Sequence, residues 1–362
     1  MSSSLSLILQ AAIKIEASDV HLSTNSPPRL RYLGDIYPLD RARALDASEI
    51  VGVHAALLPP ELRNIGYPVS DISRISTFPK NIPPDFSYTD PVTSRRFRVN
   101  AYTTVRGPAL SVRLIPNVIP TLNDIDAPEI ITQFAQFSRG LVLVTGPTGS
   151  GKSATLAAMV HHINETRRGH ILTLEDPIEH LHDDINCLVS QREIHTHARG
   201  YAAALKDALR EDPDVILVGE MRDPETIRLA LTAAETGHLV LSTLHTRSAA
   251  QSIDRIIDVF PAGENEAVRT MLAESLRGVI AQQLVHHRTE KRRLAVFETL
   301  VNTPAIRNCI REKQIGQVAA MMSTGREAGM ITLDQALKSK VQCGEIDRET
   351  AAQVAADPKQ FH

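Results

Sequence analysis

One short stretch constrains the fold of this chain more than any other part of it. Residues 146–153 read Gly-Pro-Thr-Gly-Ser-Gly-Lys-Ser, which is the pattern of a phosphate-binding loop. The glycines let the backbone curl so that its N–H groups point inward at phosphate oxygens. Lys152 is expected to reach the β- and γ-phosphates, and the Ser153 hydroxyl to hold Mg²⁺. The predicted cofactors are therefore ATP and Mg²⁺. The predicted nucleotide-binding residues of the loop are Gly146, Pro147, Thr148, Gly149, Ser150, Gly151, Lys152, Ser153 and Ala154.

The residues on both sides of the loop have the character that such a loop requires. Residues 140–145 form an apolar, β-branched run, which predicts a buried parallel strand. In the segment 154–163, helical spacing is shared by Leu156, Met159, Val160 and Ile163. The order strand, glycine loop, helix places phosphates at a helix N-terminus, whose dipole favours anions. The alternative, a glycine-rich turn that binds nothing, would need neither flank.

The second half of the chain repeats one order of elements. From about residue 126, apolar strand-like segments alternate with helical ones. The candidate strands are 141–145, 170–174, 214–218 and 239–244. Strands that alternate with helices form a parallel sheet covered on both faces, with ligands at the carboxyl ends of the strands. The predicted fold class is therefore α/β.

Changes in composition indicate where domains begin and end. A length of 362 residues favours two or three domains. Residues 1–115 mix short strands and helices, and 96–102 alternates polar and apolar residues as a half-buried strand does. The segment 116–125 is interpreted as a linker, 126–285 as the domain of alternating strands and helices, and 286–362 as a helical, charged subdomain.

A carboxylate follows one of the predicted strands. Glu220 comes after strand 214–218, and we expect it one strand over from the phosphates, where it can activate the water that attacks the γ-phosphorus. Ordinary phosphate-loop proteins carry an Asp where Gly219 stands. Mg²⁺ is therefore expected to rest on Ser153, the phosphates and water. The alternative is that Glu220 only caps a helix.

A second acidic segment follows strand 170–174. Glu175, Asp176 and Glu179 place three acids within residues 175–179. Such a cluster inside a structured core is costly without a cation, and a metal–phosphate site supplies one. Glu175 and Asp176 are therefore predicted to support Mg²⁺, and Glu179 to act with them on the attacking water. The alternative is a solvated helix start after the proline of this segment.

Histidines flank strand 239–244. His245 ends it, and a histidine at a strand tip can donate a hydrogen bond to the γ-phosphate and report its loss. His238 precedes the strand and is predicted to support His245. The alternative for each histidine is a purely structural role. A further group, interpreted as polar surface rather than as a zinc site, contains His180, His182, His195 and His197.

Composition excludes several classes of function. A net charge of −3, aromatic content of 4% and the absence of Trp argue against direct nucleic-acid binding. Three scattered cysteines fit a reducing compartment, and so a cytoplasmic protein. No apolar run approaches the ~20 residues that a transmembrane segment needs. The apolar stripe within residues 5–13 predicts an amphipathic helix that packs on its own domain rather than on a membrane.

The chain resembles the PilT family, the retraction ATPases of type IV pili within the secretion-ATPase superfamily. The resemblance rests on several motifs at matching spacing over nearly the whole length. They are the phosphate loop 146–153, the acidic box 171–179, the glycine-for-aspartate Walker B segment 214–220, the histidine box 236–245 and Ala-Ile-Arg-Asn-Cys-Ile-Arg-Glu at 305–312. A four-cysteine zinc motif of export-type relatives is missing, which favours retraction over extension.

The resemblance implies a RecA-like P-loop NTPase core, an N-terminal PAS-like α+β domain, C-terminal helices and a homo-hexameric ring. It also implies that ATP lies between the two domains and that an N-terminal arginine completes the site. Arg98, Arg106 and Arg113 are the candidates. An inner-membrane pilus platform protein is the implied partner, which would hold the protein peripherally at that membrane. The segment 305–312 is interpreted either as a partner-facing patch or as a plain amphipathic helix.

The function implied is a cytoplasmic ATPase that converts ATP hydrolysis into pilus retraction and twitching motility. Three alternatives stay open at this point. The first is an ATPase of type IVB secretion or conjugative pili with the same fold. The second is a nucleic-acid motor, which would require a basic channel and stacking aromatics. The third is a nucleotide-binding regulator that does not hydrolyse.

Overall fold

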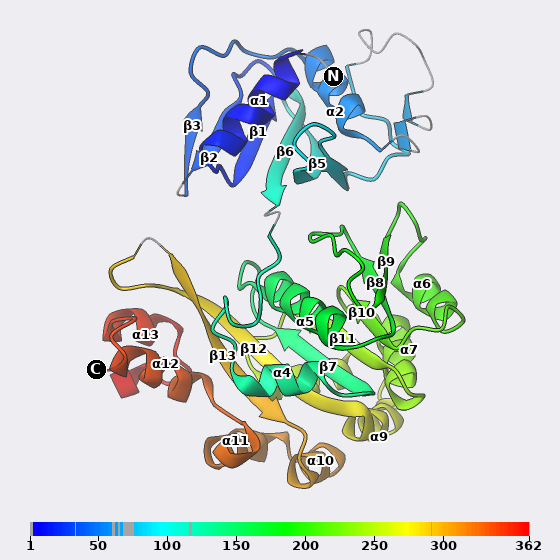
Figure 1. The fold of residues 1–362 in the computed structure, drawn as a ribbon, viewed down its shortest axis with the longest axis vertical. Helices are drawn as coiled ribbons and strands as arrows, with labels where there is room; N and C mark the ends of the chain where they lie inside the picture. Colours follow the sequence, from blue (N-terminus) through cyan, green and yellow to red (C-terminus); the bar gives the residue numbers. More distant parts are fainter. Residues whose placement is uncertain are drawn as a thin grey trace. The chain divides into compact units, whose positions relative to one another are not determined.

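The computed structural model describes residues 3–32, 34–59, 62–63, 66–67, 76–115, 118–290 and 292–361 (Figure 1). The chain divides into two compact units. The first comprises Met1–Val118 and Asp176–Leu181, and the second Ile119–Glu175 and His182–His362. In the predicted linker, residues 116 and 117 lie outside the described ranges. Within those ranges, no helix combines the length and apolar character needed to cross a bilayer.

The first unit is built on a six-stranded antiparallel sheet with the strand order β3-β2-β1-β6-β5-β4. The strands are β1 (Asp19–Ser23), β2 (Arg29–Tyr32), β3 (Asp35–Pro38), β4 (Asp85–Thr89), β5 (Arg96–Thr104) and β6 (Gly107–Ile115), and the helices are α1 (Ser3–Lys14) and α2 (Ala47–Leu57). The predicted half-buried strand is confirmed as part of β5. Its Phe97 and Val99 are fully buried with the apolar stripe of α1, whereas Arg96 and Arg98 alternate with them on the other face.

The second unit contains a seven-stranded sheet with the order β13-β12-β7-β11-β10-β8-β9. All neighbouring strands are parallel except β12 and β13, which form an antiparallel hairpin at one edge. The strands are β7 (Gly140–Thr145), β8 (His170–Glu175), β9 (Leu188–Glu193), β10 (Val215–Val218), β11 (Leu239–Leu244), β12 (Leu276–His286) and β13 (Arg293–Val301). The four strands predicted from apolar runs correspond to β7, β8, β10 and β11.

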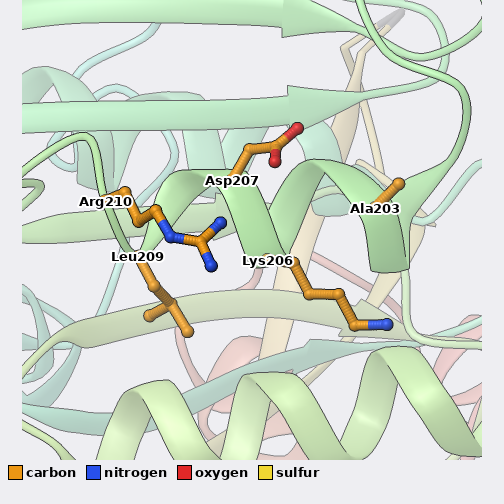
Figure 2. Close-up of a pocket in the computed structure, with 5 residues that line it drawn as sticks. All are labelled: Ala203, Lys206, Asp207, Leu209 and Arg210. Atoms are coloured by element: carbon orange, nitrogen blue, oxygen red, sulfur yellow. The ribbon is translucent and has the colours of Figure 1, made fainter.

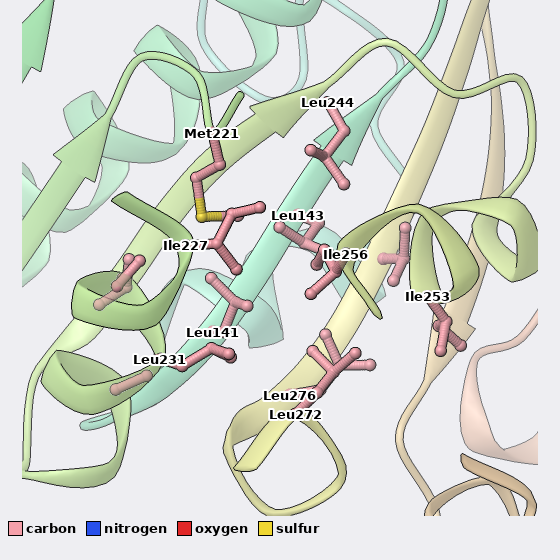
Figure 3. Packing of buried hydrophobic residues seen from close by; sticks show 14 of the residues in the cluster. Leu141, Leu143, Met221, Ile227, Leu231, Leu244, Ile253, Ile256, Leu272 and Leu276 are labelled. Carbon is pink, nitrogen blue, oxygen red and sulfur yellow. The ribbon is translucent and has the colours of Figure 1, made fainter. Parts of the chain in front are cut away.

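Helices cover both faces of this sheet, which explains why its central strands are apolar throughout. The helices are α4 (Glu129–Ala135), α5 (Lys152–Thr166), α6 (Tyr201–Ala208), α7 (Pro224–Glu235), α8 (Ala249–Asp258), α9 (Asn265–Ser275) and α10 (Pro304–Arg311). Along β7, Leu141 and Leu143 pack with α6–α10, as Figure 3 shows for part of that cluster. Val142 and Val144 pack on the opposite face with α4 and α5. The α/β prediction is confirmed.

The chain does not become helical at residue 286, because β13 extends the sheet to Val301. The C-terminal helices follow it. They are α10, the 3₁₀ turn η2 (Ile315–Gln317), α11 (Val318–Thr324), the 3₁₀ turn η3 (Arg326–Ala328), α12 (Leu333–Gln342), α13 (Arg348–Val354) and the 3₁₀ turn η4 (Pro358–Phe361). A small core joins α12, α13 and η4 to the hairpin through Val285, Leu294, Leu337, Ala351 and Phe361.

Candidate nucleotide-binding and catalytic site

The phosphate loop connects the carboxyl end of β7 to the start of α5. Gly146 has φ +144°, and an added Cβ would lie 2.3 Å from the backbone oxygen of Gln282. Gly151 has φ +88°, and an added Cβ there would lie 2.8 Å from the Gln282 Nε2. Glycine is therefore favoured at both positions by conformation and is also required by space at Gly146, whereas a side chain at Gly151 would displace the end of the Gln282 side chain. Gln282 of β12 was not predicted, because its place beside the loop depends on a strand paired from far along the chain.

The donors and acceptors of the loop fit a bound polyphosphate. α5 has no side-chain cap, so its first N–H groups are available to an anion. The buried hydroxyls of Thr145 and Ser150 have no hydrogen-bond partner among the described residues. Lys152 is 9% exposed, and its Nζ donates to the carbonyl oxygens of Gly146 at 2.9 Å and of Pro147 at 3.0 Å. These groups are the hydrogen-bonding set that phosphates would use.

The remaining predicted loop residues lie on the open side of the turn. Residues 147–149 and Ser153 are exposed, and Ala154 is half-buried. The Ser153 hydroxyl is thus accessible at the first turn of α5, which is where a Mg²⁺ ligand is expected. Within the described residues, no group of three or more His, Cys, Asp or Glu side chains could hold a metal ion, including the histidines at 180–197.

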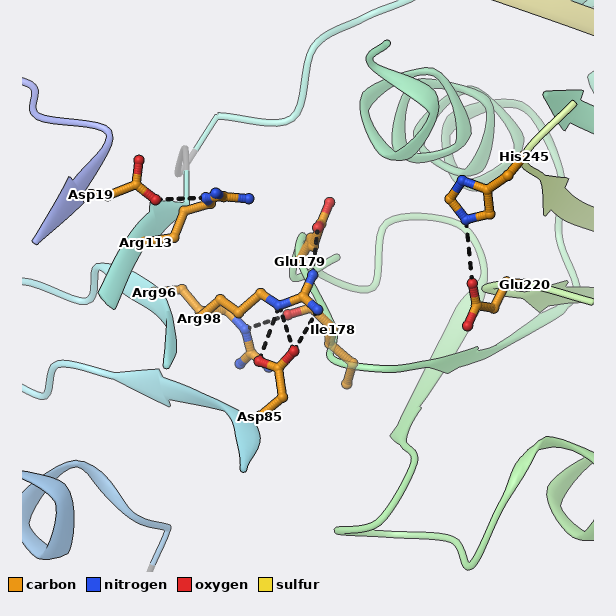
Figure 4. A network of polar contacts seen from close by, with 9 residues as sticks. All are labelled: Asp19, Asp85, Arg96, Arg98, Arg113, Ile178, Glu179, Glu220 and His245. Carbon is orange, nitrogen blue, oxygen red and sulfur yellow. Dashed lines mark hydrogen bonds and ion pairs between the residues drawn. The ribbon is translucent and has the colours of Figure 1, made fainter. Parts of the chain in front are cut away.

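Glu220 and His245 lie together at the carboxyl edge of the sheet (Figure 4). His245 Nε2 is 3.5 Å from Glu220 Oε2. On its other side, Glu220 Oε1 is 2.6 Å from the Nε of Arg222, a residue that the sequence analysis missed. The tips of β10 and β11 are tied to each other, because the Thr243 hydroxyl donates to the carbonyl oxygen of Gly219 at 2.6 Å. Glu220 and His245 therefore lie at the same edge of the sheet, as predicted.

The order of the strands differs from the expectation. β11 lies directly beside β7, and β10 lies beyond it. Glu220 is therefore two strands from the phosphate-loop strand rather than one, and the strand that ends at His245 is between them. The glycine before Glu220 has a steric reason. A Cβ on Gly219 would lie 2.9 Å from Tyr201 Oη and 3.2 Å from the Leu174 carbonyl oxygen, so an aspartate does not fit without a shift.

His238 is placed apart from the other predicted site residues. It precedes β11, and its carbonyl oxygen accepts a hydrogen bond from the N–H of Gly140 at 3.0 Å, at the start of β7. The phosphate loop and His245 lie at the opposite ends of these two strands. The length of β11 separates the two histidines by about 20 Å. The prediction that His238 supports His245 is therefore wrong within this chain.

The acidic segment is divided between the two units. Glu175 ends β8 in the second unit, where it accepts hydrogen bonds from the Thr173 hydroxyl at 2.7 Å and from Gln191 at 3.3 Å. Asp176 and Glu179 belong to the first unit. Glu179 lies 3.7 Å from Arg98 there. The three acids do not form one closed cluster, because two of them lie with the arginines of β5.

The candidate arginines of the first unit differ in their partners. Arg98 is bound by both carboxylate oxygens of Asp85, which raises the pKa of its guanidinium further. Arg113 pairs with Arg98 across the strands and is held by Asp19 at 2.9 Å, which offsets the repulsion of the two cations.

The third candidate, Arg106, lies in the turn between β5 and β6, and no carboxylate pairs with it among the described residues. An arginine that the sequence analysis missed, Arg96, donates to the carbonyl oxygen of Ile178 at 2.8 Å and to the Ser87 hydroxyl at 2.6 Å. Arg96 thereby fixes the acidic segment onto the first unit (Figure 4).

A hollow on the second unit lies outside this constellation (Figure 2). It is lined by α6 and the turn after it, through Ala203, Lys206, Asp207, Leu209 and Arg210. None of these residues belongs to the phosphate loop or to the tips of β10 and β11. The hollow therefore adds nothing to the nucleotide site.

Comparison with known proteins shows which families the chain is similar to. Residues 72–352 match the family model of type II/IV secretion system proteins. The type IV pilus retraction ATPase PilT of Pseudomonas aeruginosa is 48% identical over 354 residues, covering 98% of each chain. A twitching motility protein of Neisseria gonorrhoeae is 48% identical over 347 residues, covering 96% of this chain and 89% of its own. The crystal structure of the pilus retraction motor PilT with bound ADP superposes with a TM-score of 0.84 at 38% identity, covering 98% of this chain and 97% of that one.

Proposed function

Because this chain belongs to the type II/IV secretion system proteins and, within them, to the PilT-like pilus retraction ATPases, we propose that it hydrolyses ATP to retract type IV pili and so drives twitching motility. The observation that carries the proposal is the meeting of Glu220 and His245 at the carboxyl edge of the sheet, on the edge that carries the phosphate loop. The protein acts in the cytoplasm as a homo-hexamer. A pilus platform protein holds it at the inner membrane.

The residues of the second unit divide the chemistry among them. The loop N–H groups and Lys152 bind the β- and γ-phosphates. Glu220 takes the proton of the attacking water as general base, and Arg222 and His245 fix the orientation of its carboxylate. His245 also reports the presence of the γ-phosphate, because it stands on the strand next to β7.

Magnesium is the implied metal, and the site fits it only in part. The exposed Ser153 hydroxyl would be one oxygen ligand, and Glu175 at the end of β8 would hold a water of the metal. Mg²⁺ keeps several waters and binds substrate phosphates, so a site with few protein ligands suits it. When bound, the ion neutralises charge that develops on the phosphates.

The acidic segment is proposed to link hydrolysis to motion. Residue 175 belongs to the second unit, whereas Asp176–Leu181 belongs to the first, where Arg96 and Arg98 hold it. The chain therefore passes from the second unit to the first directly after the end of β8. An arginine of that unit completes the γ-phosphate site, because the transition state needs additional positive charge. Arg106 is the candidate we favour, since Arg98 and Arg113 are already held by carboxylates.

Two substitutions test the assignment. Glu220→Gln should retain ATP binding and lose turnover by about a hundredfold or more, because the amide cannot accept the proton. Lys152→Ala should weaken nucleotide binding itself. Binding of a fluorescent ATP analogue and steady-state ATPase activity separate the two effects. Glu225→Gln, on an exposed carboxylate paired with Lys206, is the matched control and should behave as wild type. Turnover in Glu220→Gln equal to wild type would refute the role of Glu220.

A deletion strain tests the cellular function. Cells without a retraction ATPase should carry more surface pili and should not twitch. Bald cells would indicate assembly instead, and normal piliation with lost secretion or conjugation would indicate one of those machines. DNA- or RNA-stimulated hydrolysis would point to a nucleic-acid motor, and tight ATP retention without turnover to a regulator.

A further inference from the structure

A buried carboxylate on β13 holds the first turns of two helices. Glu298 lies opposite Ala281 of β12, and the residue is only 9% exposed. Its Oε1 accepts a hydrogen bond from the N–H of Ala249 at 2.7 Å, and its Oε2 from the N–H of Leu333 at 3.2 Å. Ala249 is the first residue of α8, and Leu333 is the first residue of α12.

Packing alone does not explain a carboxylate at this position. An ion buried without partners is costly, and an apolar side chain would fill the same space without that cost. Burial raises the pKa of Glu298, and the two backbone donors oppose this by stabilising the anion. The side-chain caps Ser248 and Thr332 serve N–H groups deeper in the same helices. Glu298 thus satisfies donors at both helix starts that would otherwise lack partners.

The first of these helices begins immediately after the catalytic edge. Only Thr246, Arg247 and Ser248 separate His245 from α8. The loop is fixed at one end by β11 and at the other by the first turn of α8, where the Thr246 and Ser252 hydroxyls are 2.6 Å apart. A connection this short transmits a shift of the α8 N-terminus to His245.

The second helix belongs to the C-terminal helices. The residue after Glu298, Thr299, exchanges backbone hydrogen bonds with Ile331, and its hydroxyl donates to the carbonyl oxygen of Gly329 at 2.7 Å. The chain entering α12 is therefore docked along β13 beside the carboxylate. One side chain consequently touches both the C-terminal helices and the helix that follows His245.

We propose that Glu298 is a positioning residue that keeps His245 opposite Glu220 by holding the start of α8, and that it makes this position depend on the C-terminal helices through α12. The proposal rests on the ATP hydrolysis proposed above for Glu220. It assigns the C-terminal helices an influence on turnover without any contact with nucleotide.

The first test replaces the carboxylate by an amide of the same shape. In Glu298→Gln the amide oxygen can still accept a hydrogen bond from one helix N–H. The amide NH₂ faces the other helix N–H, and because both are donors, that helix start loses its hydrogen bond. We expect kcat to fall about tenfold while KM for ATP changes less than about twofold, because the phosphate loop is untouched. Asp347→Asn is the matched control. It removes a carboxylate that caps α13 through the N–H of Thr350 and does not touch α8, so kcat should stay at the wild-type value.

The second test removes the backbone donors while keeping Glu298; Leu333→Pro also removes a buried leucine side chain, and Ala249→Pro adds a ring at a buried position. Ala249→Pro and Leu333→Pro each delete one N–H to Glu298 at a helix position that accepts proline. Ala249→Pro should lower kcat as Glu298→Gln does, and Leu333→Pro should lower it less. Because Ala249→Pro keeps Glu298, it decides the question even if Glu298→Gln does not fold.

A double-substitution experiment distinguishes positioning from general destabilisation. In a His245→Ala protein, adding Glu298→Gln should lower the residual turnover no further, because the residue that it positions is gone. Wild-type kcat in Glu298→Gln, or an undiminished effect in the His245→Ala protein, would overturn the proposal. An unchanged kcat in Leu333→Pro would overturn the part of the proposal that makes the position of His245 depend on the C-terminal helices. If Glu220→Gln were fully active, the proposed function itself would fall, which is a separate result.

Discussion

At the scale of single residues, the glycines of the phosphate loop differ in what a side chain would meet. Gly149 and Gly151 both have positive φ, but a Cβ on Gly149 would meet nothing within 4 Å, whereas one on Gly151 would meet Gln282. Both alanine variants should lose about 1 kcal/mol to backbone strain. Only Gly151→Ala should also weaken ATP binding, by about tenfold, because either the Gln282 side chain or the loop must shift. Chemical denaturation and nucleotide titration compare the pair. Equal losses of affinity would contradict the steric argument.

His54 gives the first unit a dependence on pH. It is buried in α2, its Nδ1 is 2.8 Å from the Tyr67 hydroxyl, and burial lowers its pKa to about 4. The unfolded chain binds this proton near pH 6.5, so the stabilisation is complete above pH 6.5 and is lost as the pH falls through about 4. At pH 4 the loss is about 3 kcal/mol. His54→Phe should flatten the slope of unfolding free energy against pH between 4 and 6.5. An unchanged slope would show that other groups cause it.

The site residues that belong to short local sequence motifs could be predicted. Lys152, Glu220 and His245 follow apolar strands, and the carboxyl ends of parallel strands meet at one edge. Gln282 and Glu298 carry no such local signal, because their roles come from strand pairing across more than a hundred residues or from two distant helix starts. His238 was grouped with His245 by its motif, although it precedes β11 and the start of that strand lies at the opposite edge of the sheet.

At the scale of elements, α10 shows how an amphipathic helix divides between core and surface. Ile306 and Ile310 are fully buried in the core of the second unit, so the apolar face of 305–312 is not an exposed patch. Arg307 and Arg311 lie on the outside near Glu274. Of the segment 305–312, the face that carries Arg307 and Arg311 is therefore the one that a partner could contact.

The two faces of α10 should respond differently to truncation. Ile310→Ala should destabilise the protein by about 2–4 kcal/mol, because it leaves a cavity. Arg311→Ala should change stability by less than about 1 kcal/mol, since it breaks only a surface ion pair. Denaturant unfolding measures both. If Ile310→Ala left stability unchanged, the helix could not be packed as described.

The strands differ in how far the sequence determines them. β7, β8, β10 and β11 were predictable because strands buried on both faces read as continuous apolar runs. The β12–β13 hairpin was missed because its turn is charged and its outer residues are polar. The pairing of β12 with β7 is non-local, yet it places the hairpin that carries Gln282 and Glu298 in the sheet. The strands that carry the candidate site residues were therefore easier to predict than the hairpin beside them.

At the scale of the whole molecule, the proposed ring makes a site depend on two copies of the chain. Arg106 stands in the first unit without a carboxylate partner among the described residues, and Glu220 stands in the second. If the arginine acts on a neighbour's nucleotide, Arg106→Ala alone should lower kcat by about a hundredfold or more without lowering the melting temperature. Arg98→Ala, which leaves Asp85 unpaired, should instead lower that temperature.

Mixing two inactive variants tests this dependence directly. In rings of equal parts Arg106→Ala and Glu220→Gln, about a quarter of the sites receive a wild-type arginine from one copy and a wild-type glutamate from the next. Turnover of the mixture should therefore recover to about a quarter of the wild-type value, although each variant alone is nearly inactive. If both residues served the same site from one chain, no mixed ring would contain an intact site and no turnover would return. Recovery with Arg98→Ala in place of Arg106→Ala, and none with Arg106→Ala, would transfer the role to Arg98. The mixing result thus separates action between copies from action within one chain, and it does so without assuming the symmetry of the ring.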